Sequence, residues 1–227
     1  MAKEFTELAR RGPTDSIQER TLPDGTKVKS WGPGIDLRKE PFKWFLASML
    51  YGARISTTIA KKTYKVYDEE GLTSAPKIAA SNRETLVNLH GRGGYVCYDG
   101  ITADYILGVS RKLLENYDGD IEKLDKISQN SRDLERRLQE FRGVGPVTTK
   151  IFLRELRGLW KNAHPEPTSV EILAARKLGL IESHENALEN LKEFWRKNRV
   201  KSYDFRNFEA ALVRIGLKLR REKNKTR

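Results

Sequence analysis

One glycine-containing segment, Phe141-Arg142-Gly143-Val144-Gly145-Pro146-Val147-Thr148-Thr149, has residue types suited to binding a phosphate group. Gly143 and Gly145 allow a positive φ and the close approach of another backbone. Pro146 suits the first turn of a following helix. The first amides of a helix have no acceptor within the helix and can face an anion. The segment therefore predicts a turn that holds a phosphate through its main-chain N–H groups.

Apolar residues recur three or four positions apart on both sides of this turn: Leu134, Leu138 and Phe141 before it, and Ile151, Phe152 and Leu156 after it. This spacing predicts two helices that each bury one stripe. The two helices are expected to pack against each other, with Val144 inserted into the core between them. Residues 131–160 are therefore predicted to form a helix, a tight turn and a second helix.

The charge of the 227-residue chain favours a polyanionic partner. Lysine and arginine number 43 against 31 aspartates and glutamates, which gives a formal net charge of +12, and nucleic acid is the best match to such an excess. A membrane is a poorer match because no apolar run approaches a spanning length and the first residues lack the core of a signal peptide. The chain is therefore expected to act inside the cell, in the cytoplasm or on the nucleoid.

The single cysteine, Cys97, limits the cofactors that the chain can hold. It cannot form an internal disulfide or a zinc or iron–sulfur site with several thiolates. The three histidines, His90, His164 and His184, show no metal-ligand spacing and are expected at the surface or at helix ends. No resident cofactor is predicted from these residues.

The remaining pattern is almost wholly helical, so the predicted fold class is all-α. Helices are expected over residues 41–50, 55–67, 81–89, 101–117, 120–127, 170–178, 187–198 and 205–219. A small β-hairpin could turn at Pro23-Asp24-Gly25. Loop-like residues 31–36 and the two prolines within 161–167 indicate two lobes. One lobe is predicted at 40–162, and the other combines 1–39 with 163–227.

The order of these features resembles the endonuclease III-like helix-hairpin-helix (HhH-GPD) DNA glycosylase superfamily. The resemblance runs over roughly residues 41–219, and residues 141–145 carry it most specifically, with Gly94-Tyr95 before them and Arg176-Lys177-Leu178-Gly179 after them. It implies a six-helix barrel lobe, a second helical lobe and no iron–sulfur cluster. It also implies a protein that holds damaged duplex DNA between its lobes and turns a nucleotide out of the stack.

The resemblance further implies which residues contact DNA: Arg54, Gly143, Val144, Gly145, Val147, Thr148, Thr149 and Lys150. Arg54 occupies the place where the family often inserts a side chain into the gap left by the extruded base, and a solvated surface arginine is the alternative interpretation. The family also implies a monovalent cation held by main-chain carbonyls, here those of Gln139, Phe141 and Val144.

Two departures from the family bear on catalysis. Bifunctional members carry a nucleophilic lysine where this chain has Val147, and Schiff-base chemistry needs an amine. Nearly all members place an aspartate where this chain has Thr168. Thr168-Ser169-Val170-Glu171 is typical of a capping box, and threonine has no charge with which to stabilise an oxocarbenium-like cation.

Two functional hypotheses follow. The first is a sequence-tolerant DNA-binding protein of the repair glycosylase type, without ordinary glycosylase or lyase chemistry. The second is an active glycosylase or abasic-site lyase in which Glu171, Asp99 or an unidentified amine has taken over the reaction. A third and weaker hypothesis is a protein-interaction domain whose hairpin packs on another protein.

Overall fold

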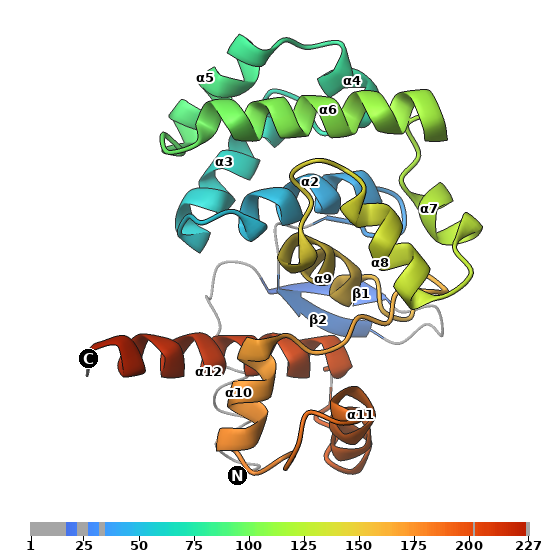
Figure 1. Ribbon diagram of the computed structural model, residues 1–227, viewed down its shortest axis with the longest axis vertical. Coiled ribbons are helices and arrows are strands. Elements are labelled where there is room, and N and C mark those ends of the chain that lie inside the picture. The colour runs from blue at the N-terminus through green and yellow to red at the C-terminus, as the bar shows by residue number, and fades with distance from the viewer. Residues whose placement is uncertain (1–16, 22–26, 32–34, 202, 226–227) are drawn as a thin grey trace. The chain divides into compact units, whose positions relative to one another are not determined.

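A computed structural model describes residues 17–21, 27–31, 35–201 and 203–225 of the chain (Figure 1). Contacts between Cα atoms divide the chain into two compact units. One unit is Ile35–Pro165, and the other combines Met1–Gly34 with Glu166–Arg227.

The unit Ile35–Pro165 consists of helices. They are α2 (Pro41–Gly52), α3 (Thr57–Glu69), α4 (Ala75–Ala79), α5 (Arg83–Gly93), α6 (Asp99–Tyr117), α7 (Glu122–Ile127), α8 (Ser131–Gln139) and α9 (Pro146–Glu155). The long helix α6 lies along α4 and α5, and α2 lies beside α9 (Figure 1). Every predicted helix of this unit is present. The five-residue α4 was not predicted because it is too short to show an apolar period.

Helix α2 forms the centre of this unit and carries α9. Phe45 is fully buried, and its ring lies 5.0 Å from that of Phe152 and 6.4 Å from that of Phe141, between centroids. The indole Nε1 of Trp44 donates to the carbonyl of Phe152 at 3.2 Å. Trp44 and Phe45 are therefore core residues, and they fix α9 and the turn residue Phe141 to α2.

In its described residues, the other unit combines two short strands with three helices. Strands β1 (Ile17–Thr21) and β2 (Lys27–Trp31) pair antiparallel, with Ile17 opposite Trp31. The predicted β-hairpin is thus present, although its turn at 23–25 lies outside the described residues. The helices are α10 (Ser169–Lys177), α11 (Ala187–Lys197) and α12 (Phe205–Lys225), whose core includes Phe208 stacked on Trp195. Helix α12 continues beyond the predicted end at residue 219.

No helix in the described part of the chain is long and apolar enough to cross a membrane.

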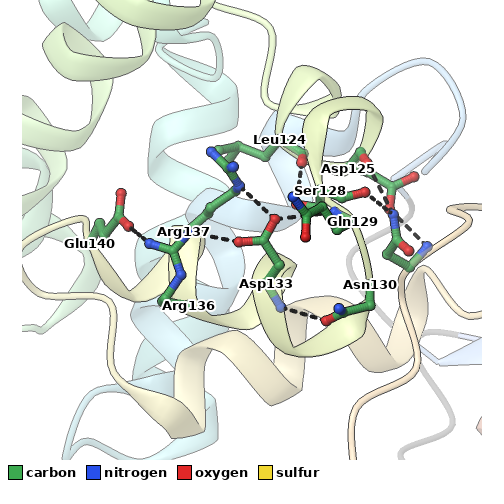
Figure 2. A network of polar contacts seen from close by, with 10 residues as sticks. Leu124, Asp125, Ser128, Gln129, Asn130, Asp133, Arg136, Arg137 and Glu140 are labelled. Carbon is green, nitrogen blue, oxygen red and sulfur yellow. Dashed lines mark hydrogen bonds and ion pairs between the residues drawn. The ribbon is translucent and has the colours of Figure 1, made fainter.

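A buried carboxylate ties the segment after α9 back to α7. Asp125, 7% exposed, accepts from the main-chain N–H groups of Lys161 at 3.0 Å and Asn162 at 2.9 Å. The Asn162 side chain donates in return to the carbonyls of Asp125 and Ser128, both at 3.1 Å. Figure 2 shows Asp125 beside a second network, in which hydrogen bonds from Arg136 lower the pKa of Asp133 to about 2. Together these networks fix both ends of the hairpin.

We predict that Asp125→Ala lowers the free energy of unfolding by about 3 kcal/mol, because two main-chain amides lose their acceptor in a buried place. Glu122→Ala is the matched control on the same helix, since Glu122 forms an exposed pair with Lys126 and such pairs contribute less than about 1 kcal/mol. Urea denaturation of both variants measures the difference. Equal effects of the two substitutions would contradict the assigned role of Asp125.

His90 lies in the last turn of α5 but is buried in the core, which corrects the expectation of a surface position. It is fully buried, Tyr67 Oη lies 2.9 Å from its Nε2, and its Nδ1 lies 3.0 Å from the carbonyl of Asp99. Its ring also contacts that of Tyr95. Burial lowers the pKa of His90 below the usual value for histidine. The neutral form is therefore the one that the fold accommodates.

We predict that stability declines as the pH falls below about 6.5, the ordinary pKa of an unfolded histidine. The unfolded chain then binds a proton that folded His90 does not, so protonation favours unfolding, and the loss continues down to the lowered folded pKa. An NMR titration should place the transition of His90 below about 6.5, the ordinary pKa of histidine. A His90 transition at or above that value would contradict the lowered pKa.

Candidate nucleic-acid interface

The turn between α8 and α9 depends on Gly143. Its φ of 88° lies in the left-handed region, and a Cβ atom at this position would overlap the side chain of Tyr105 on α6. Val144, 3% exposed, inserts into the core as predicted, and its N–H donates to the carbonyl of Phe141 at 3.0 Å. The turn is therefore held closed by α6 on one side and by its own core residues on the other.

Gly145 is in an extended conformation. Its φ of −94° and ψ of −180° are backbone that any residue adopts, so the positive φ that glycine allows is not used there. A Cβ atom on Gly145 would meet no atom within 4 Å. Gly145 is the N-cap of α9, and it brings no side chain that could accept from the first turn of that helix. The space in front of the helix start is therefore open.

The first amides of α9 are left without an acceptor. Within the described residues, nothing accepts from the N–H groups of Gly145, Val147 and Thr148, whereas Thr149 donates to the carbonyl of Gly145 at 3.0 Å. The Val147 side chain is 58% exposed. Pro146 occupies the first turn, as predicted, and has no N–H. Unpaired amides at the positive end of a helix form an anion-binding geometry.

The residues Val144, Thr148 and Thr149, which were predicted to contact DNA, are buried. Thr148 is 4% exposed and Thr149 is fully buried. The hydroxyl of Thr149 donates to the carbonyl of Gly145 at 3.0 Å, and that of Thr148 lies against Gly52 of α2, where a Cβ atom would overlap it. The side chain of Val144 is also buried, and its amide is paired with the carbonyl of Phe141. Their contact with DNA stays a prediction.

Arg54 lies close to this helix start. The contact between Gly52 and Thr148 brings the end of α2 against the start of α9, and Arg54 follows two residues later as an exposed side chain. Neither Arg54 nor the half-buried Lys150 has a carboxylate partner in the described part of the chain. Both cations are therefore available to an anion.

The carbonyls implied for a monovalent cation, those of Gln139, Phe141 and Val144, lie at the hairpin turn. The carbonyl of Phe141 accepts from Val144, and the Lys112 ammonium donates to the neighbouring carbonyl of Glu140 at 3.3 Å. The cation stays a prediction.

The predicted capping box is present at the start of α10. The Thr168 hydroxyl accepts from the Glu171 amide at 3.3 Å, and Glu171 Oε2 accepts from the Thr168 amide at 2.6 Å and from its hydroxyl at 2.5 Å. Glu171 is 3% exposed. Asp99, the other candidate carboxylate, accepts from the amide of Gly100 at 2.8 Å. Both carboxylates are thus engaged at helix starts.

Two residues that hold the hairpin were missed in the sequence. Tyr105 supports Gly143, and Gly52 admits Thr148. Both lie far along the chain from the turn, and neither belongs to a recognisable motif. A contact between distant helices carries no local signal, so only the folded structure identifies them.

Comparison with known proteins identifies the fold. No family model matches the sequence, and no curated protein matches it significantly. The 3-methyladenine DNA glycosylase MagIII of H. pylori, bound to 1,N6-ethenoadenine, matches 98% of this chain and 96% of its own, with a TM-score of 0.57 and 12% identity. The 8-oxoguanine glycosylase/lyase of Clostridium acetobutylicum in its apo-form matches 94% of this chain and 68% of its own, with a TM-score of 0.46 and 16% identity. The similarity to MagIII shows that the chain has a helical DNA glycosylase fold, as the resemblance predicted.

We predict that Gly143→Ala and Gly145→Ala have unequal effects on stability. Gly143→Ala places a Cβ on a left-handed residue against Tyr105 and should cost about 1–3 kcal/mol. Gly145→Ala meets open space and should cost less than about 1 kcal/mol, the difference expected at an N-cap. Thermal or urea unfolding measures both, and equal losses would contradict the assigned geometry.

Proposed function

We propose that the protein binds duplex DNA of a damaged or distorted kind, within the base-excision-repair glycosylase superfamily, by holding the phosphate backbone at the start of α9. The observation that carries the proposal is that nothing in the described residues accepts from the amides of Gly145, Val147 and Thr148, and that a Cβ atom on Gly145 would meet no atom within 4 Å. The net charge of +12 supports it, and so does the fold shared with a DNA glycosylase.

The proposed contacts are made to the phosphate backbone and not to the bases. Main-chain amides, Arg54 and Lys150 recognise phosphate oxygens, and phosphate contacts carry no direct sequence information. Preference among DNA molecules then comes from how easily a site bends or loses a base from its stack. The protein would act at the chromosome, in agreement with the predicted nucleoid association.

Ordinary glycosylase and lyase chemistry is not part of the proposal. Val147, in place of the lysine, offers an exposed apolar side chain and no amine. Thr168 offers no negative charge, and the carboxylate of Glu171 is buried in the cap of α10. A carboxylate that accepts from an amide and a hydroxyl at 2.6 and 2.5 Å is already committed to structure.

We predict salt-sensitive binding to duplex DNA. The logarithm of the association constant should fall linearly with the logarithm of the salt concentration, with a slope of about −0.9 for each phosphate neutralised. Fluorescence anisotropy with labelled duplexes of unrelated sequence measures the slope, and the sequences should give similar affinities. No binding, or binding that salt does not weaken, would reject the proposed function.

We predict no base release and no strand cleavage from a panel of oligonucleotides. The panel holds 3-methyladenine and 1,N6-ethenoadenine, after the name and bound ligand of MagIII, together with uracil, oxidised bases, mismatches and abasic sites. Release that Glu171→Gln abolishes would establish the enzyme instead. Thr168→Ala is the control, because it breaks the same cap and leaves the carboxylate in place.

A further inference from the structure

Exposed cations of the unit Ile35–Pro165 are commonly paired with carboxylates. Arg83 pairs with Asp104 at 2.9 Å, Arg92 with Glu70 at 2.6 Å and Lys43 with Glu40 at 2.7 Å. Beyond the pair itself, the field of the cation is largely cancelled by that of the carboxylate. These cations therefore add little to the attraction of a polyanion. The cations around the hairpin turn are arranged differently.

Arg142 is held by an aromatic ring and not by a carboxylate. It lies in the turn beside Gly143, is exposed, and has its guanidinium carbon 5.6 Å from the ring centre of Tyr105. The same Tyr105 supports Gly143. Among the residues that the structure describes, no carboxylate forms an ion pair with Arg142.

Lys112 repeats this arrangement on the other side of the turn. It lies seven residues after Tyr105, on the same face of α6. Its ammonium is 5.2 Å from the ring centre of Phe141 and 3.3 Å from the carbonyl of Glu140. The carboxylate of Glu140 pairs instead with Arg136. The charge of Lys112 is thus fixed in place by neutral groups.

A cation–π contact orients a cation without cancelling its charge. An ion pair also orients the cation, but the carboxylate neutralises the charge of the pair. Tyr105 and Phe141 therefore hold two uncancelled positive charges at the turn that leads into α9, and the ordering of both side chains precedes binding. Less side-chain freedom is then lost when a ligand is bound.

From this geometry we propose that Arg142 and Lys112, positioned by Tyr105 and Phe141, are phosphate-binding residues that contact the same nucleic-acid strand as the α9 amides. The inference rests on the proposed function, and it adds two side chains to the phosphate contacts of the hairpin amides. Tyr105 is a positioning residue in this account, since it touches Arg142 and not the strand.

The test compares Arg142→Gln and Lys112→Gln with Arg83→Gln, which removes one equally exposed charge that is paired with Asp104. Affinity for a labelled duplex is measured by anisotropy over a range of KCl concentrations. Each of the first two variants should bind at least about fivefold more weakly, and the magnitude of the salt slope should fall by about 0.9. Arg83→Gln should keep the wild-type slope and bind within about twofold of wild type.

A second pair of variants tests the ring. Tyr105→Leu should weaken binding at least about threefold with the salt slope unchanged, because the charge remains and only its fixed position is lost. Tyr105→Phe retains the ring and should bind like wild type. Thermal unfolding of every variant measures whether weaker binding comes from a loss of folding.

The outcomes separate the two proposals. A wild type that binds no duplex contradicts the proposed function and this inference with it. Wild-type binding that Arg142→Gln and Lys112→Gln leave unchanged in affinity and slope overturns this inference alone. An equal loss of affinity in Arg83→Gln also overturns this inference. The loss would then come from the lower net charge of the protein and not from the position of the charge at the hairpin.

Discussion

The hairpin has one feature on which the rest depends: no side chain caps the start of α9. An N-cap residue normally offers an oxygen to the first amides of its helix. Thr168 does so at α10, where Glu171 completes the box. Gly145 offers none, and open space lies in front of it. The same fold thus contains one helix start that is satisfied from within and one whose amides require an outside acceptor.

The surrounding packing holds this start in place. Tyr105 closes the turn over Gly143, Gly52 lets α2 approach Thr148, and Val144 fills the core beneath. Each contact comes from a different part of the chain. The networks of Asp125 and Asp133 fix the ends of the two hairpin helices. Rigid supports of this kind keep the amides in a geometry suited to phosphate before any ligand arrives.

The sequence predicted the features that local chemistry decides. The helical periods, the proline in the first turn of α9 and the capping box at Thr168 depend on residues close together in the chain. The burial of Thr148 and Thr149 was missed because α2 buries the start of α9, and nothing near residue 148 encodes α2. The conformation of Gly145 was left open by the sequence because glycine tolerates both signs of φ. His90 was misplaced because a polar residue can be buried once Tyr67 and the Asp99 carbonyl lie within hydrogen-bond distance.

The most direct measurement is the DNA affinity of Gly145→Ser. A serine hydroxyl at the N-cap can accept from the amides of Val147 or Thr148, so it occupies the proposed phosphate site without changing the net charge. The account predicts a variant at least as stable as wild type that binds duplex DNA at least about tenfold more weakly, the loss expected for one hydrogen bond to a charged group. Wild-type affinity in this folded variant would show that the amides do not hold the phosphate.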